Sequence, residues 1–451
     1  MSKITIVGGG LVGSLLAIFL AKRGHSVNVY ERRGDPRKTD VYAGRSINLV
    51  VSHRGWTALR AAGVEEAVKQ ITVPVYARMM HDREGKLNRV PYSIDNKAIH
   101  SVSRGELNKR LLSEAEKLPN VKLFFDHRCL DVDLQHAACT FEHNGERVQV
   151  NADVVFGADG APSAVRQKMM QGRFTYSQEY IEHDYKEIAF PANADGTPKM
   201  DPQCLHIWPR RWFMLMGLAN QDGGFTGTLF MPNTHTDQAP GFDTVKTEEQ
   251  VRNFFNQQFP DVPGIIPDVV EQYLRNPQSS LAIIRCNPWQ VNGKVALIGD
   301  AAHAIVPFYG EGMNAGYEDC KVLNDLLNEH GDDNWAEVLP RYATQRKPNG
   351  DAIADLSLRN FVEMRDLVAD PQFLLRKKIE GHIQAKHPDK WLPLYSQVKF
   401  SDIAYKDAWN EGLRHDRIME EVLAMEGVAE KWESEEVERK VLGLLGTIRL
   451  V

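Results

Sequence analysis

The chain has 451 residues, 43% of them hydrophobic, which is enough for a large core and for two or three domains. A formal net charge of −6 gives no support for binding to nucleic acid or to an anionic membrane surface. The five cysteines are scattered and odd in number, without a CxxC pair or a Cys/His cluster, so we expect neither a disulfide framework nor a metal site.

The opening segment predicts a nucleotide-binding turn. Residues 4–7 have the apolar composition of a short buried strand. Directly after it comes a GxGxxG motif made of Gly8, Gly10 and Gly13. In such a motif the first glycine permits a tight turn, the second lets the backbone approach a pyrophosphate, and the third lets the helix pack against the strand. The helix that starts near Leu11 would place its N-terminal amides against that pyrophosphate.

An acidic residue follows the second predicted strand, residues 26–30. The carboxylate of Glu31, roughly 20 residues after the turn, can accept hydrogen bonds from ribose hydroxyls and would repel a 2′-phosphate. The order of strand, turn, helix, strand and acid therefore predicts tightly bound FAD or NAD rather than NADP. The glycine triplet alone does not separate FAD from NAD.

Two alternatives compete with this interpretation. The apolar run 11–21 has the length of a signal-peptide core, and a glycine-rich turn can be purely structural. The glycine spacing and the helix end at 22–24 favour a buried helix over a secretory segment. No other stretch approaches the about 18 apolar residues that a membrane span requires.

Two more strand–turn–helix units lie downstream. A strand beginning at Val154 runs into Asp159-Gly160 and a helix start. Another, residues 295–298, ends at Gly299-Asp300, and a loop then leads to a helix that begins near Gly312. A NAD-dependent dehydrogenase has no use for this last unit, whereas a flavin does.

The last unit can serve the flavin in two ways. Asp300 can hold the ribityl chain, while the amides of residues 312–314 can face the pyrimidine edge of the isoalloxazine. A helix N-terminus at that edge stabilises negative charge on the reduced flavin. We interpret His303, in the intervening loop, as a packing residue.

The order GxGxxG, Asp159-Gly160, Gly299-Asp300 is similar to that of the FAD-dependent aromatic hydroxylases, the single-component flavoprotein monooxygenases. The resemblance implies FAD as the tight cofactor and NADPH as a transient co-substrate, because the chain has no second strand–GxGxxG–helix unit. It also implies an α/β fold: a Rossmann-type FAD-binding domain with an inserted mixed β-sheet substrate domain and a C-terminal helical region.

Further segments, from residue 4 to about residue 405, resemble one family of this group, the kynurenine 3-monooxygenases. They are GRSINLVVSHRG (44–55), ARMMHD (77–82), SVSRGELNKRLL (101–112), LHIWPRRWF (205–213), TLFMP (228–232), VPFYGEGMNAG (306–316), RNFVEMRD (359–366) and PLYSQVKFS (393–401). The resemblance implies hydroxylation of L-kynurenine to 3-hydroxy-L-kynurenine in tryptophan degradation. NADPH and O2 would be consumed through a flavin C4a-hydroperoxide.

The zwitterionic head of kynurenine calls for specific polar partners. Its carboxylate suits a planar bidentate donor, and Arg78 matches the family's arginine for this contact. Tyr92 and Tyr395 match two family tyrosines that hydrogen-bond the same head group. Asn360 matches an asparagine near the amino acid end. Taken alone, Arg78 would be equally well explained as an exposed strand arginine.

The aniline ring needs an apolar slot. Within residues 212–219 and 228–230, alternate side chains share one face of each predicted strand. An ordinary sheet core would show the same alternation, so the pocket wall rests on the resemblance. The predicted contacts of the slot are Leu205, Met214, Met216, Leu218, Thr228, Phe230, Pro307, Phe308 and Met364.

The resemblance also supplies a set of cofactor contacts, in which no side chain acts as acid or base because the flavin performs the chemistry. Tyr309 and Glu311 depart from the Phe or His and the Gln that are commoner in the family's loop, so we expect differences at the flavin edge. The predicted cofactor contacts are Gly8, Gly10, Leu11, Val12, Gly13, Glu31, Arg32, Arg33, Arg45, Val50, Arg104, Cys129, Leu130, Asp159, Asp300, Gly312, Met313 and Asn314.

The predicted organisation has three parts. The FAD-binding domain is discontinuous (1–70, 98–175 and 286–330), the substrate sheet comprises 71–97 and 176–285, and residues 331–451 form a helical region that closes the pocket. Eukaryotic relatives carry a hydrophobic membrane anchor after this region, and its absence predicts a soluble, cytoplasmic enzyme. The oligomeric state stays open, a homodimer included.

Three rival functions remain. A second aromatic hydroxylase, acting on a phenol or aminobenzoate, would have no need for Arg78 together with two tyrosines. A flavoprotein reductase or oxidase would pass electrons to a quinone or a protein without incorporating oxygen. A non-enzymatic FAD-binding sensor would need a partner surface that the sequence does not reveal.

Overall fold

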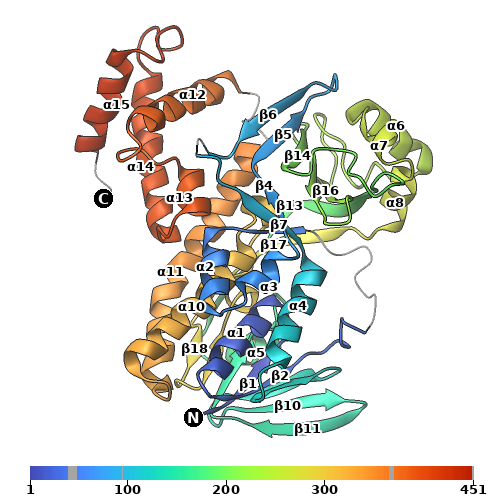
Figure 1. The fold of residues 1–451 in the computed structure, drawn as a ribbon, viewed down its shortest axis with the longest axis vertical. Helices are drawn as coiled ribbons and strands as arrows, with labels where there is room; N and C mark the ends of the chain where they lie inside the picture. Colours follow the sequence, from blue (N-terminus) through green and yellow to red (C-terminus); the bar gives the residue numbers. More distant parts are fainter. Residues whose placement is uncertain (39–47, 94, 365–369, 449–451) are drawn as a thin grey trace.

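The computed structural model describes residues 1–38, 48–93, 95–364 and 370–448 (Figure 1). It contains a lower body built on a parallel sheet, an upper region built on a larger mixed sheet, and a group of C-terminal helices beside that upper region.

A six-stranded sheet forms the centre of the lower body. Its strands are parallel except for the edge strand β18, and helix α1 (Leu11–Lys22) makes the first crossover. Their order across the sheet is β18 (Gln290–Val291), β19 (Val295–Leu297), β12 (Val154–Gly157), β1 (Lys3–Val7), β2 (Ser26–Tyr30) and β8 (Val121–Phe124).

This order explains why distant turns meet. The three predicted turns follow β1, β12 and β19, which are neighbours in the sheet and run in the same direction. The carboxyl ends of parallel strands lie at one edge, where open α/β sheets bind their ligands. Thus Gly8, Asp159 and Asp300 come to one edge of the sheet.

The helices and small sheets of the lower body cover this sheet. Helix α1 packs between α10 and α4, and its apolar residues from Leu15 to Leu20 are buried on all sides. The covering elements are α2 (His53–Ala61), α3 (Glu65–Lys69), α4 (Arg104–Glu116), α5 (Ala164–Met169), α9 (Asp300–His303), the 3-10 turn η1 (Pro307–Tyr309), α10 (Gly312–His330), and two three-stranded sheets, β11 (Glu146–Asn151)–β10 (Ala138–His143)–β9 (Arg128–Asp133) and β3 (Asn48–Val51)–β7 (Ile99–Ser103)–β4 (Val73–Val75).

A seven-stranded sheet forms the upper region. Its pairs are antiparallel except β14 with β5, and helices α6 (Glu248–Gln258), α7 (Val262–Ile265) and α8 (Val269–Arg275) accompany it. The strand order is β17 (Ser279–Asn287), β13 (Thr175–Phe190), β16 (Phe225–Pro232), β15 (Met214–Ala219), β14 (Cys204–Pro209), β5 (Ala77–His81) and β6 (Leu87–Pro91).

The C-terminal part is helical: α11 (Trp335–Val362), α12 (Pro371–Lys386), α13 (Leu394–Phe400), α14 (Tyr405–Leu423) and α15 (Glu435–Thr447). Helix α11 links two cores, because Trp335 and Tyr342 pack in the core of the lower body whereas Ile353 packs with Tyr405 of α14. The fold class predicted from the sequence is confirmed. The exact three-part division stays a prediction.

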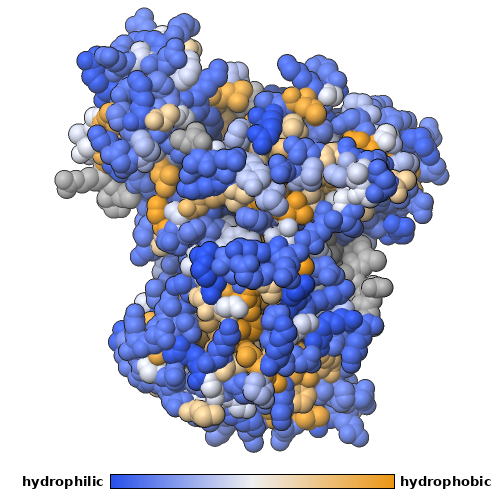
Figure 2. All heavy atoms as spheres, viewed as in Figure 1, coloured by the Kyte–Doolittle hydropathy of each residue, from blue (hydrophilic) through white to orange (hydrophobic). Residues whose placement is uncertain are grey.

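On the face in Figure 2 the surface is mostly hydrophilic, with hydrophobic atoms showing through near α1 and along the level where the upper region meets the lower body. No helix within the described residues is long and apolar enough to cross a membrane. The five cysteines are unpaired.

Candidate active site

A continuous cavity of about 500 Å³ runs from the first glycine turn to the seven-stranded sheet. Two sets of predicted residues line it. From the predicted cofactor contacts these are Gly8, Gly10, Leu11, Val12, Glu31, Arg32, Arg33, Val50, Arg104, Asp159, Asp300, Gly312 and Met313; from the predicted substrate contacts they are Arg78, Tyr92, Leu205, Met216, Leu218, Thr228, Phe230, Pro307, Phe308, Met364 and Tyr395.

At the first turn, two glycines lie too close to other backbone atoms to carry a side chain, and a third leaves the cavity next to it open. Gly8 has φ +108°, and a Cβ there would lie 2.4 Å from the Ala158 carbonyl oxygen. A Cβ on Gly13 would lie 2.0 Å from the Gly8 oxygen. A Cβ on Gly10 would meet no atom of the described residues within 4 Å, because Gly10 faces the cavity at the start of α1. The turn thus has the shape that a pyrophosphate needs.

Glu31 closes the nucleotide end of the cavity. One of its oxygens accepts a hydrogen bond from the Gly9 amide at 2.9 Å, and the other accepts one from the Arg33 amide at 3.0 Å. Because a carboxylate has about four acceptor sites, both oxygens can still receive ribose hydroxyls.

Asp159 leaves a buried acceptor without a partner. Its Oδ2 accepts from the Ala164 amide at 2.7 Å, whereas its Oδ1 has no hydrogen-bond partner among the described residues. Burial raises the pKa of this carboxyl group above its ordinary value. A ligand hydroxyl in the cavity would satisfy Oδ1, which fits the ribityl or ribose part of FAD.

The third turn brings a helix N-terminus to the cavity. Asp300 begins α9, and Gly312 and Met313 begin α10, whose free amides can face an electron-rich ring edge. Asn314 does not line the cavity: its side-chain amide donates to the Val50 carbonyl at 2.8 Å, and its Oδ1 accepts from the Ser52 amide at 3.1 Å. The residues of the three turns therefore fit FAD, with Asn314 holding α10 against β3.

Three predicted side chains form the head-group end of the cavity. The Arg78 guanidinium lies over the Tyr395 ring, 4.7 Å from its centroid, and 5.6 Å from the centroid of Tyr92. The two tyrosine rings are stacked at 5.4 Å. Within the described residues no carboxylate lies in ion-pair distance of Arg78, and its Nε and the Tyr92 hydroxyl are buried without hydrogen-bond partners.

Electrostatics keep this cluster ready for an anion. Burial lowers the pKa of Arg78, but Tyr395, Tyr92 and the Glu363 carboxylate together raise it by more, so the pKa lies above its ordinary value and the side chain is cationic. Burial, together with Tyr395, holds the pKa of Tyr92 well above its ordinary value, which keeps its hydroxyl as a donor. The cluster therefore offers a cation and a hydroxyl donor, which together suit the binding of a carboxylate.

An apolar slot adjoins this cluster. Met216 and Leu218 of β15, Thr228 and Phe230 of β16, and Phe308 line it. Met214 lies on the same strand but outside the cavity lining; it is buried in the adjoining core with Phe230 and Ile207.

Asn360 lies behind the slot rather than in it. Its side-chain amide donates to the Phe308 carbonyl at 2.7 Å and lies 3.3 Å from the Met364 sulfur. It is 5% exposed and does not line the cavity. Its geometry thus suits holding Phe308 in place, whereas direct contact with a ligand stays a prediction.

Two of the predicted cofactor contacts are absent from the cavity lining. Cys129 and Leu130 of β9 do not line it, and Leu130 is 40% exposed. Arg45 lies outside the described residues. His303 is buried beside Trp289, with its Nε2 2.6 Å from an Asp319 oxygen.

The sequence reasoning missed Lys399 as a lining residue. Lys399 follows Tyr395 by four positions in α13, so the two share one helix face. That spacing is the signal that would have found it.

Comparisons with known proteins agree with this geometry. Residues 1–357 match the family model described as an FAD binding domain. The chain is 48% identical over 445 residues to kynurenine 3-monooxygenase from Christiangramia forsetii, with 98% of each chain covered. It is 42% identical over 426 residues to the Anopheles gambiae protein of the same name, covering 93% of this chain and 86% of that one. Among solved structures, 2-methyl-3-hydroxypyridine-5-carboxylic acid oxygenase shares the fold, with a TM-score of 0.67 at 19% identity over 82% of this chain and 94% of that chain.

Proposed function

We propose that this chain, which belongs to the kynurenine 3-monooxygenase family, hydroxylates L-kynurenine at the ring carbon next to its amino group, using NADPH and O2. One observation carries the proposal: beside the apolar slot, a buried arginine has no carboxylate in ion-pair distance, and a neighbouring tyrosine hydroxyl has no hydrogen-bond partner, among the residues that the structure describes. An amino acid with an aromatic side chain matches both halves of that arrangement.

The head group of the substrate would be fixed by charge. The kynurenine carboxylate would accept hydrogen bonds from Arg78 and from the Tyr92 hydroxyl, two groups whose donors find no partner within the described part of the chain. Because the cluster is buried, this ion pair is screened little by solvent. Tyr395 would lie against the same head group from α13.

The apolar slot would orient the ring and exclude water. Met216, Leu218 and Phe230 offer apolar faces to an aniline ring, and Phe308 lines the same cavity. Exclusion of water protects a reactive oxygen species from collapse and strengthens the electrostatic contacts of the site. No side chain near the slot is required as an acid or base; the residues act by orientation.

FAD would lie along the three turns, held by the amides of α1 and α10 and by Glu31, Asp159 and Asp300. When bound, it takes electrons from NADPH and activates oxygen. The α10 N-terminus would stabilise negative charge at its edge.

The test is product analysis with purified protein. We expect a yellow protein that consumes NADPH and O2 in step with kynurenine and forms 3-hydroxykynurenine containing one atom of labelled oxygen gas. Turnover of NADPH without label in the product would contradict the proposal and favour a reductase or oxidase. Hydroxylation of a phenol or aminobenzoate in preference to kynurenine would favour a different hydroxylase.

The proposal includes the cytoplasm as the location of the enzyme. Cell fractionation tests the location, and a mass measurement in solution gives the state of assembly.

A further inference from the structure

An ion pair without solvent exposure borders the cavity. The Lys399 ammonium lies 2.7 Å from the Glu311 carboxylate, and the two side chains are 2% and 0% exposed. Glu311 directly precedes α10, and Lys399 lines the cavity from α13. A buried charge pair of this kind is costly to desolvate, so its presence at the cofactor edge requires a reason.

The Glu311 carboxylate is fully hydrogen-bonded. Its Oε2 accepts from the Tyr405 hydroxyl at 2.6 Å and from the Ser52 hydroxyl at 3.2 Å. Its Oε1 accepts from Lys399 and, at 3.3 Å, from the Asn314 side-chain amide. Burial and the Glu311 charge hold the pKa of Tyr405 well above its ordinary value, so Tyr405 remains a donor. These contacts fix the carboxylate in one position.

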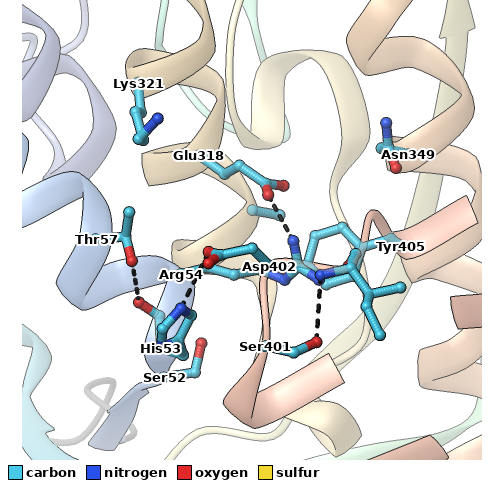
Figure 3. A network of polar contacts seen from close by, with 12 residues as sticks. Ser52, His53, Arg54, Thr57, Glu318, Lys321, Asn349, Ser401, Asp402 and Tyr405 are labelled. Carbon is cyan, nitrogen blue, oxygen red and sulfur yellow. Dashed lines mark hydrogen bonds and ion pairs between the residues drawn. The ribbon is translucent and has the colours of Figure 1, made fainter. Parts of the chain in front are cut away.

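The network beyond Glu311 is balanced in charge. Arg54 of α2 lies over the Tyr405 ring, 4.1 Å from its centroid, and pairs with Glu318 of α10 at 2.6 Å (Figure 3). Arg346 of α11 pairs with both Glu318 and Asp319 at 2.7 Å. The three carboxylates are thus matched by three cations, of which Lys399 is the one that reaches the cavity.

Glu311 stands where its charge would oppose the proposed reaction. It occupies the N-cap position of α10 without capping the helix through its side chain. A carboxylate there would offset the positive end of the helix, which is the end that Gly312 and Met313 present to the cavity. Lys399 cancels that charge at contact distance.

We propose that Lys399 is a positioning residue that neutralises Glu311 and so keeps the α10 N-terminus favourable to a negatively charged, reduced flavin. This inference rests on the proposed function, since it assumes that FAD occupies the cavity. Lys399 and Tyr395 share one face of α13, so the helix that meets the substrate head group also sets the charge at the cofactor edge.

The test compares three variants by their preference for reduced over oxidised FAD, measured anaerobically from the midpoint potential without kynurenine. Lys399→Met removes the cation that contacts Glu311, and we expect the preference for reduced FAD to fall by about tenfold or more, the order of magnitude of a nearby charge in a buried site. The double variant Glu311→Gln/Lys399→Met carries neither charge and should return to within about threefold of the wild type. Glu311→Gln alone leaves the Lys399 ammonium without its carboxylate and should raise the preference for reduced FAD above that of the wild type.

Lys406→Met is the matched control. Lys406 is exposed at the start of α14, so this substitution removes the same charge from a side chain outside the network. It should leave the preference unchanged. An unaltered preference in Lys399→Met would overturn the inference. If that variant does not fold, Glu311→Gln decides: a preference equal to or below that of the wild type overturns it. Since kynurenine is absent from the measurement, failure of the proposed hydroxylation would leave this result intact.

Discussion

The two ends of the cavity are shaped by different parts of the chain, one by backbone turns and the other by side chains. At the nucleotide end, backbone turns do the shaping, and Gly8 and Gly13 have no room for a Cβ. At the head-group end, side chains from β5, from the segment after β6 and from α13 converge, and donors on Arg78 and Tyr92 have no hydrogen-bond partner in the described part of the chain. Gly8 and Gly13 are therefore fixed by local chain geometry that leaves no room for a side chain, whereas the head-group end is assembled over long range and should lose only ligand affinity when altered.

The largest effect is expected from Gly13→Ala. Its Cβ would lie 2.0 Å from the Gly8 oxygen, inside the tightly packed strand–helix contact, so we expect loss of more than about 4 kcal/mol of stability. Urea denaturation measures the loss of stability, and the yellow colour of the purified protein shows whether FAD is retained. Gly24→Ala is the control, because its φ of +88° is strained but its surroundings are open, and it should cost only about 1 kcal/mol.

Gly10→Ala separates packing from cofactor contact at the same end. Its Cβ meets no atom within 4 Å in the described part of the chain, so the stability of the FAD-free protein should change by less than about 1 kcal/mol. FAD affinity should nevertheless fall, because the methyl group enters the groove. Equal FAD affinity in this variant and the wild type would place the pyrophosphate elsewhere.

At the head-group end, Arg78→Met should raise the KM for kynurenine on the order of a hundredfold, because the substrate carboxylate loses its buried cation. Bound FAD should be retained, as judged by its absorption spectrum. Arg89→Met, an exposed arginine on strand β6 of the same hairpin, should leave both quantities unchanged. An unchanged KM in the Arg78 variant would refute the carboxylate assignment.

The sheet that carries the head-group end should also be sensitive to pH. Burial lowers the pKa of His206 from 6.5 to about 4, so the folded protein holds it neutral while the unfolded chain takes up a proton below pH 6.5. Stability is therefore full above that pH and falls as the pH drops from 6.5 towards 4, by about 2 kcal/mol between pH 7 and pH 5. Denaturation at both pH values should show this loss, and His206→Gln should remove that contribution.

The smallest effect is expected from Tyr92→Phe. The change deletes a buried hydroxyl that has no hydrogen-bond partner among the described residues, so the melting temperature without substrate should hold or rise slightly. The KM for kynurenine should increase about tenfold, since one hydrogen bond to a charged group is lost. A lower melting temperature with unchanged KM would show that the hydroxyl serves the fold instead.

The sequence predicted what depends on local chemistry. Gly8, Glu31 and Asp159 lie in motifs whose spacing follows from strand–turn–helix geometry, and neighbouring parallel strands then bring their turns together. The Lys399–Glu311 pair could not be found this way, because it joins α13 to the start of α10 and exists only after the C-terminal helices pack.

Asn360 illustrates the same limit. The resemblance placed it near the substrate, but only the packing of α11 against η1 reveals that its amide is engaged by the Phe308 carbonyl. Cys129 and Leu130 were likewise placed on resemblance, whereas in the structure they belong to β9 and do not line the cavity.

The hairpin of β5 and β6 has an evolutionary consequence. It lies at the edge of the seven-stranded sheet, it contributes Arg78, and it takes no part in the six-stranded sheet that frames the nucleotide end. Exchange of this hairpin would therefore change which acids the protein binds and leave the nucleotide end of the cavity unchanged. The hairpin is thus the segment to replace or randomise when a different substrate specificity is sought.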